Sequence, residues 1–78
     1  MKIMALNLPR DFTEDQLAKL FKQHGNIKSA TVVMDETTGK SKGFGFVEMA
    51  LAHEGEAVIE KLHGTRVGKK KIRVKAAK

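Results

Sequence analysis

The alternation of apolar and polar side chains predicts four short strands along the chain. These segments are residues 2–8, 27–34, 42–49 and 70–75. The first is an apolar run that stops before Pro9, which has no amide hydrogen to donate to a neighbouring strand. The other three carry β-branched or aromatic side chains, as half-buried strands do. Residues 35–41 are polar and rich in turn-forming types, so we expect the second and third strands to pair as a hairpin.

A helix is predicted after Phe12, where a cap precedes a helical apolar stripe. Thr13 can accept hydrogen bonds from free amides, and Gln16 completes a capping box, so the helix should begin at residue 14. The stripe has the three- and four-residue spacing of one buried face and consists of Leu17, Leu20, Phe21 and His24. We expect Gly25 to end the helix in the left-handed conformation.

Residues 52–62 predict a second helix, which Gly64 should end. Its stripe consists of Gly55, Val58, Ile59 and Leu62. A glycine inside a helix costs roughly 1 kcal/mol of stability relative to alanine. We therefore expect Gly55 to permit a close approach between this helix and the sheet.

The predicted order is β-α-β-β-α-β. Two helices with one apolar stripe each can both be buried against the same face of a four-stranded antiparallel sheet, which leaves the other face open to water. We therefore expect an α+β, ferredoxin-like fold. One domain should span residues 1–78, with a core of about residues 2–76 and a loose basic tail at 76–78.

The size of the chain argues against an enzyme. A chain of 78 residues has room for one thin core, because it buries only about 60% of the surface that its unfolded form exposes. The absence of cysteine excludes disulfides and thiolate zinc sites. The histidines His24, His53 and His63 do not have metal-ligand spacing, so we expect neither a metal nor a cofactor.

Hydropathy gives an expectation about location. The apolar runs are too short for a signal peptide, and none approaches the roughly 18 residues of a membrane helix. We expect a soluble, cytoplasmic monomer with no membrane partner.

The charge is strongly polarised along the sequence. Lys and Arg number 15 against nine Asp and Glu, which gives a net charge of +6. Residues 61–78 contain eight of the cations and no carboxylate. Such a basic end favours a polyanionic partner such as a nucleic acid, because cations that neutralise phosphates release condensed counterions. A merely solvated basic face is the alternative that charge alone leaves open.

Alternation in segment 42–49 predicts which side chains face water. Val47 and Met49 are core candidates, so Phe44 and Phe46 should stand on the opposite, open face. The reversed orientation would bury the charges that flank the two rings, which makes it unfavourable. Two exposed aromatic rings in one patch are typical of a binding site.

The other strands surround these rings with cations. The outward set of the first strand is Lys2, Met4 and Leu6, and that of the last strand is Lys71, Arg73 and Lys75. Aromatic rings can stack on bases while cations hold phosphates, so the surface suits a single-stranded nucleic acid. Stacking contributes roughly 1–3 kcal/mol per base.

Segment 42–49 (KGFGFVEM) resembles the octapeptide of the RNA recognition motif family: basic, Gly, aromatic, Gly or Ala, aromatic, aliphatic, any, aromatic. Seven of its eight positions match. Segment 3–8 (IMALNL) is similar to the hexapeptide of the family's first strand. The resemblance covers residues 2 to about 76 and departs from the pattern at Met4 and Met49, where the family has aromatic residues. It implies a non-catalytic domain that binds single-stranded RNA across its open sheet face.

The resemblance also implies roles for single residues. Phe44 and Phe46 would contact bases or sugars, and Lys42 would contact a phosphate. Met4 would hold a third platform position with a flexible thioether instead of a ring. Asn7 mostly supports the end of the strand in this family, so we interpret it as structural.

Glu48 and the basic run 69–71 each have two possible interpretations. Glu48 shares the open face and can either accept a hydrogen bond from a base or pair with Lys2 or Arg73. The run 69–71 either binds phosphate, which we favour, or is solvated at the start of the strand. The complete set of predicted RNA-binding residues is Phe44, Phe46, Met4, Lys42, Lys2, Arg73, Lys75, Lys71 and Glu48.

Two other binding functions compete with RNA binding. The same fold can bind proteins through a helix face, typically when the platform aromatics are absent, so the presence of Phe44 and Phe46 argues against this function. Single-stranded DNA remains a second alternative, because stacking does not read the 2′-hydroxyl.

Overall fold

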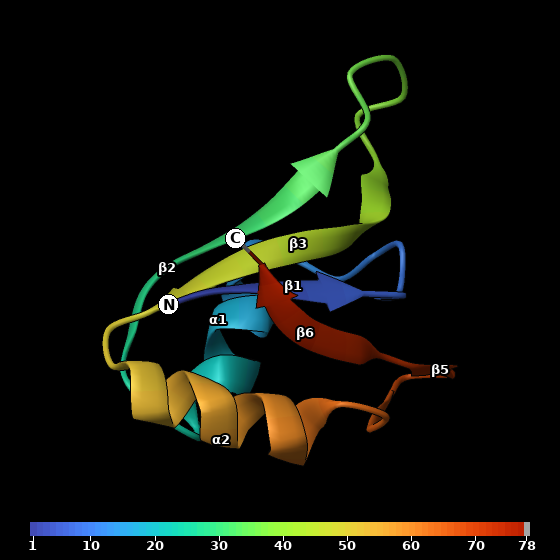
Figure 1. Cartoon of the computed structure of the whole chain (residues 1–78). Helices are drawn as coiled ribbons and strands as arrows, with labels where there is room; N and C mark the ends of the chain where they lie inside the picture. Colours follow the sequence, from blue (N-terminus) through green and yellow to red (C-terminus); the bar gives the residue numbers. More distant parts are fainter. Residues whose placement is uncertain (78) are drawn as a thin grey trace.

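The computed structural model describes residues 1–77. Its elements are β1 (Lys2–Leu6), α1 (Glu14–Lys22), β2 (Ile27–Met34), β3 (Ser41–Met49), α2 (Ala52–Leu62), β4 (Arg66–Val67), β5 (Lys70–Lys71) and β6 (Arg73–Ala77). Four strands form an antiparallel sheet in the order β2-β3-β1-β6, and β4 pairs with β5 as a separate hairpin. Both helices lie on one side of the four-stranded sheet (Figure 1), which confirms the predicted fold.

The core lies between the two helices and the sheet face that they cover. Its buried apolar side chains are Ile3, Ala5, Leu8, Leu17, Phe21, Val32, Val47, Met49, Val58, Leu62, Ile72 and Val74. Val47 and Met49 of β3 belong to this set, and successive side chains of a strand alternate between its two faces. Phe44, Phe46 and Glu48 therefore point to the other face. The orientation of β3 predicted from the sequence is therefore confirmed.

The start of α1 follows from its cap. The Thr13 hydroxyl accepts a hydrogen bond from the Gln16 amide at 3.2 Å, and the Gln16 side chain accepts one from the Thr13 amide at 2.9 Å. This reciprocal pair is the predicted capping box, and the helix begins at Glu14 as expected.

The expected left-handed glycine at the end of α1 is wrong. The helix ends at Lys22 with Gln23 as a right-handed cap, and Gly25 is not among the residues with positive φ. A Cβ on Gly25 would lie 3.0 Å from both the Glu54 Cβ and the Met49 Cε. Space, and not backbone conformation, is the physical reason for a glycine here.

Helix α2 has the predicted bounds. Gly64 follows it with φ of 83°, as expected for a glycine that ends a helix. A Cβ on Gly55 would lie 2.5 Å from the Sδ atom of Met1. We expected Gly55 to let α2 approach the sheet closely. Its close neighbour is the Met1 side chain, immediately before β1.

Strand β1 is shorter than the predicted segment 2–8. It ends at Leu6 because Asn7 adopts φ of 61°, a left-handed conformation that asparagine tolerates better than most residues. The Asn7 side-chain amide donates a hydrogen bond to the Lys71 carbonyl at 2.8 Å. Asn7 therefore has the structural role that we inferred for it.

The last predicted strand, 70–75, is divided in the structure. Residues of β4 and β5 pair with each other, and the backbone of Ile72 bonds to Gly64 and Thr65, so only from Arg73 onward does the chain pair with β1. Strand β6 then continues to Ala77. The expected loose tail is therefore wrong for residues 76 and 77, which pair with β1, and residue 78 lies outside the described residues.

Candidate nucleic-acid interface

The sheet face away from the helices is organised in rows that cross the strands. Three rows run across β3, β1 and β6 in that order: Phe46, Met4 and Lys75; Phe44, Leu6 and Arg73; Glu48, Lys2 and Ala77. The octapeptide and hexapeptide segments are the two central strands of the sheet. The predicted apolar platform therefore lies in the middle of the face, with cations on the neighbouring edge strand β6.

The two rings of the platform are half-buried and in contact. The centroids of Phe44 and Phe46 are 6.2 Å apart, and the ring planes meet at 86°, an edge-to-face arrangement. The Lys2 ammonium lies 5.0 Å from the centroid of the Phe46 ring, within the range of a cation–π interaction. Lys2 thus lies over one face of the Phe46 ring.

A hollow of about 500 Å³ adjoins Phe44 at one end of the platform. Its lining includes four cationic side chains and no carboxylate: Arg10, Lys42, Lys70 and Arg73. The other lining residues are Leu6, Asn7, Leu8, Gly43 and Phe44. We call this site the cationic hollow, and its composition suits an anion that is attached to a flat or apolar group.

Sequence reasoning missed Arg10 as a member of this site. Arg10 follows Pro9 in the connection between β1 and α1, and no periodic pattern orients it. In the structure Arg10 lies beside Gly43: its Nε is 3.8 Å from the point where a Cβ on Gly43 would lie, an ordinary van der Waals distance. No signal in the sequence pointed to this placement.

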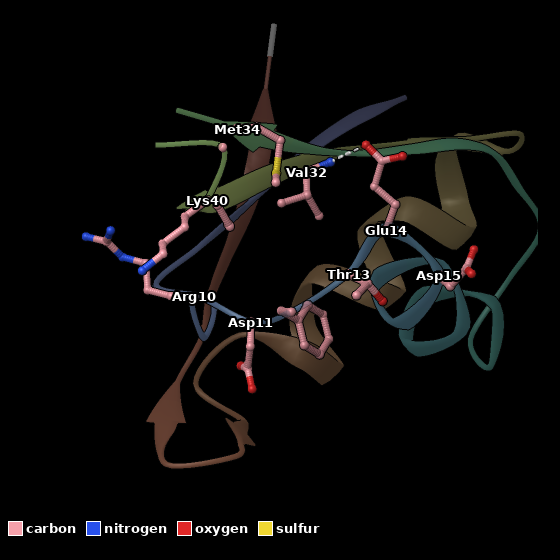
Figure 2. A pocket seen from close by; sticks show the side chains of 11 residues that line it. Arg10, Asp11, Thr13, Glu14, Asp15, Val32, Met34 and Lys40 are labelled. Atoms are coloured by element: carbon pink, nitrogen blue, oxygen red, sulfur yellow. Dashed lines mark hydrogen bonds between the residues drawn. The ribbon is translucent and has the colours of Figure 1, made fainter. Parts of the chain in front are cut away.

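A larger hollow lies elsewhere. It has a volume of about 670 Å³ and is lined by the start of α1, the end of β2 and the β2–β3 loop. Figure 2 shows Glu14 at this site, where its carboxylate accepts a hydrogen bond from the Val32 amide at 3.0 Å. Asp11 and Asp15 also line it, so three carboxylates make it a poor site for a polyanion despite its size.

Glu48 forms an ion pair that we did not expect. Its Oε2 lies 3.0 Å from the terminal ammonium of Met1, whereas the ion pair that we considered as an alternative to base binding was with Lys2 or Arg73. This ammonium hydrogen bond holds the pKa of Glu48 below its usual value, with smaller contributions from the charges of Lys28 and Lys2. Arg73 lies two rows away across the sheet, which explains why it does not reach Glu48.

Lys71 lies outside the four-stranded sheet. It belongs to β5, where it pairs with Arg66, and its backbone carbonyl is bound by Asn7. The side chain is exposed on the hairpin. The structure thus has two strands where we predicted one, with Lys71 in β5 and with Arg73 and Lys75 in β6.

Metal-binding clusters and membrane-spanning helices are both absent from the described part of the chain. Within residues 1–77 no group of three His, Asp or Glu side chains is arranged to hold a metal ion. Neither helix in this range is long and apolar enough to cross a membrane.

Comparison with known proteins identifies the family. The model of the RNA recognition motif family matches residues 4–73. The chain belongs to this family. The match extends from β1 to the start of β6 and includes the octapeptide and all but the first residue of the hexapeptide.

Solved structures of RNA recognition motif proteins share this fold closely. The crystal structure of RNA binding protein PG1 has a TM-score of 0.95 at 39% identity, over 99% of this chain and 93% of that chain. A structure titled Sxl-lethal protein/RNA complex has a TM-score of 0.94 at 30% identity, over 99% of this chain and 46% of that chain. These similarities support RNA binding as the general function of the fold seen here.

Curated relatives are longer plant proteins. Small ribosomal subunit protein cS22 of Spinacia oleracea is 43% identical over 87% of this chain and 26% of its own length. The chloroplastic RNA-binding protein CP29B of Arabidopsis thaliana is 38% identical over 97% of this chain and 26% of its own length. The chain thus spans about a quarter of the length of either relative.

These relatives contradict the expected cytoplasmic location. CP29B of Arabidopsis thaliana and the 28 kDa ribonucleoprotein of Nicotiana sylvestris are both named as chloroplastic. The expectation was wrong because a lack of long apolar segments argues only against signal peptides and membrane helices. It does not distinguish one soluble compartment from another.

Proposed function

We propose that this chain is a single, non-catalytic domain that binds single-stranded RNA across its open sheet face. Bases stack on Phe44 and Phe46, and the surrounding Lys and Arg side chains contact phosphates. The observation that carries the proposal is a pair of half-buried aromatic rings at the centre of a face that the helices leave uncovered. The RNA-complex title of a structural neighbour and the names of the relatives support the same partner.

Stacking provides the contacts to the bases. A base on each ring contributes roughly 1–3 kcal/mol, so the two rings together contribute roughly 2–6 kcal/mol. Lys2 must leave the face of Phe46 when a base arrives, and its ammonium is then free to contact a phosphate. An exposed cation–π contact is worth only about 0.5–1 kcal/mol, so this exchange favours the base.

Met4 extends the platform between Phe46 and Lys75. Its thioether can pack on a base, but it presents no rigid flat surface. We therefore assign it a weaker third stacking position. Glu48 lies at the end of the platform, where its carboxylate can accept a hydrogen bond from a base amino group.

Cations along two sides of the platform bind the RNA backbone. Lys42 is the second residue of β3, and Arg73 and Lys75 project from β6 beside the apolar rows. Lys71, on the hairpin of β4 and β5, is a peripheral contact to a phosphate of the RNA. Because such contacts release counterions, affinity should fall steeply as salt rises.

The experiment that tests this function is a titration of the purified chain with a labelled random-sequence single-stranded RNA pool, followed by amide chemical-shift mapping. We expect binding, with the largest shifts at β1 and β3 residues of the open face. Shifts confined to α1 and α2 would refute the proposal and favour a protein-binding surface. Competition with DNA of matched sequence tests the preference for RNA, and sedimentation of the free chain tests our proposal that it is a monomer.

A further inference from the structure

The cationic hollow has more positive charge than the stacking model requires. One phosphodiester carries a single negative charge, whereas Arg10, Lys42, Lys70 and Arg73 all line this hollow. Its volume is about 500 Å³, whereas a water molecule occupies about 30 Å³ in the liquid. The hollow is therefore large enough for more than one phosphate group. The site therefore suits a ligand with more negative charge than a single phosphodiester linkage.

The four cations come from four separate segments that are fixed together. Arg10 lies after β1, Lys42 in β3, Lys70 in β5 and Arg73 in β6. Figure 1 shows the end of β1 and the strand β5 at the same end of the molecule. The hollow is consequently a product of the tertiary fold and not of one basic run in the sequence.

Two contacts hold the hairpin against the connection that carries Arg10. A Cβ on Gly68, at the turn of the hairpin, would lie 3.7 Å from the Cγ of Pro9, so the turn lies beside the Pro9 ring. The Asn7 side chain also donates to the carbonyl of Lys71 at 2.8 Å. Lys70 and Arg10 are therefore brought to one site by packing on both sides of them.

Carboxylates do not neutralise this charge. Within residues 1–77 none of the four cations lies within 4.0 Å of a carboxylate oxygen in an ion pair. Arg10 also borders the larger hollow, but its guanidinium points away from Glu14 and Asp15 there (Figure 2). The backbone amides of Thr38 and Thr37 are the main cause of the lowered pKa of Asp35, and the charges of Lys42 and Arg10 lower it further without forming an ion pair.

We propose that the cationic hollow holds two successive phosphates of the bound strand, with Arg10 and Lys70 as phosphate ligands beside Lys42 and Arg73. This proposal rests on the proposed RNA-binding function and adds a defined anchor at one end of the platform. The nucleotide between the two phosphates lies against Phe44, which shares the lining of the hollow. The anchor is indifferent to base identity, because phosphates carry no sequence information.

The test compares the salt dependence of RNA binding in three proteins: the wild type, R10Q/K70Q and the control K19Q/K22Q. The control removes two exposed cations from α1, on the side away from the open face. Each lost phosphate contact lowers the slope of log affinity against log salt by about 0.7 for single strands, so R10Q/K70Q should lose about 1.4. The control should keep the wild-type slope.

The outcomes separate this inference from the function on which it rests. A wild-type chain that does not bind RNA refutes the proposed function. If the wild type binds RNA and R10Q/K70Q has the same slope, RNA binding stands and the anchor is refuted.

A second measurement tests the number of phosphates. Neutral methylphosphonate linkages placed one at a time along the RNA should weaken wild-type binding most at two adjacent positions. The same substitutions should have a smaller effect on R10Q/K70Q. A single sensitive linkage, or sensitivity unchanged in R10Q/K70Q, contradicts the two-phosphate site.

Discussion

Met4 stands on the open face at a position where the hexapeptide of the RNA recognition motif family has an aromatic residue. The side chain is half-buried between Phe46 and Lys75. A thioether covers less of a base than a ring does and is more flexible. An aromatic residue at this third position of the platform should therefore stack better on a base than Met4 does.

We predict that Met4→Phe raises affinity for single-stranded RNA by about 1 kcal/mol, or roughly fivefold, through added stacking. Fluorescence anisotropy with a labelled RNA measures the change. Met34→Phe is the matched control, because Met34 is exposed at the edge of the larger hollow and away from the platform. Equal gains in the two variants, or no gain at position 4, would argue against a stacking role for Met4.

Glu48 is the residue whose charge state links the platform to pH. The hydrogen bond from the Met1 ammonium lowers its pKa in the folded state, so folding favours the ionised carboxylate. This contribution to stability is complete above the unfolded pKa of about 4.3 and is lost as the pH falls through the lower folded value.

Glu48→Gln should therefore be less stable than the wild type at neutral pH, and the difference should shrink as the pH falls below about 4.3. Urea denaturation at several pH values measures the difference. A constant difference across this range would mean that the ion pair does not contribute to folding.

At the scale of elements, Gly45 is the position where β3 passes closest to its neighbours. A Cβ there would collide with the backbone oxygen of Thr31 in β2 and lie 3.1 Å from the Leu17 Cδ2 in α1. The glycine thus lets strand and helix pack below the platform while Phe44 and Phe46 remain above it.

Gly45→Ala should lower the free energy of unfolding by about 1–3 kcal/mol through overpacking. RNA affinity per folded molecule should not change, since the new methyl group lies on the face away from the rings. Gly39→Ala is a control for backbone strain, because Gly39 has positive φ but no atom within 4 Å of the added Cβ. A Gly45→Ala protein as stable as the wild type would show that the strands can separate at little cost.

Local signals in the sequence predicted most elements and the orientation of the platform. Thr13 and Gln16 fixed the start of α1 because a capping box involves only neighbouring residues. The alternation around Val47 decided which way Phe44 faces, because a strand has only two faces.

The errors concern features that depend on distant partners. The left-handed Asn7 and the bonds of Ile72 divide the ends of two predicted strands, and neither has a local pattern. Arg10 lies in the cationic hollow beside Gly43, 33 positions later in the sequence, and Asn7 bonds to Lys71 across 64 positions. Periodicity does not predict contacts between residues so far apart, nor the bonds that Ile72 makes within its own loop.

At the scale of the whole molecule, charge and apolar surface are arranged on one face. The net charge of +6 is concentrated in the last third of the chain, and β6 brings two of its cations beside the central strands. A polyanion is therefore attracted to the same face that carries the rings.

Reversing the charges in Arg73→Glu/Lys75→Glu should weaken RNA binding for all sequences and flatten its salt dependence by about 0.7 per lost phosphate contact. The measurement is a series of binding titrations at increasing salt with several unrelated RNAs. Loss of affinity for some sequences only would mean that these residues read bases instead of phosphates.

The most direct measurement of the central claim is the RNA affinity of Phe44→Ala/Phe46→Ala, compared with that of Leu51→Ala. Leu51 is an exposed apolar residue that precedes α2 and lies away from the platform, so it controls for lost apolar surface. With both folds verified by circular dichroism, we predict that the double variant loses roughly 2–6 kcal/mol of binding free energy and that Leu51→Ala loses none. Wild-type affinity in a folded double variant would contradict the account.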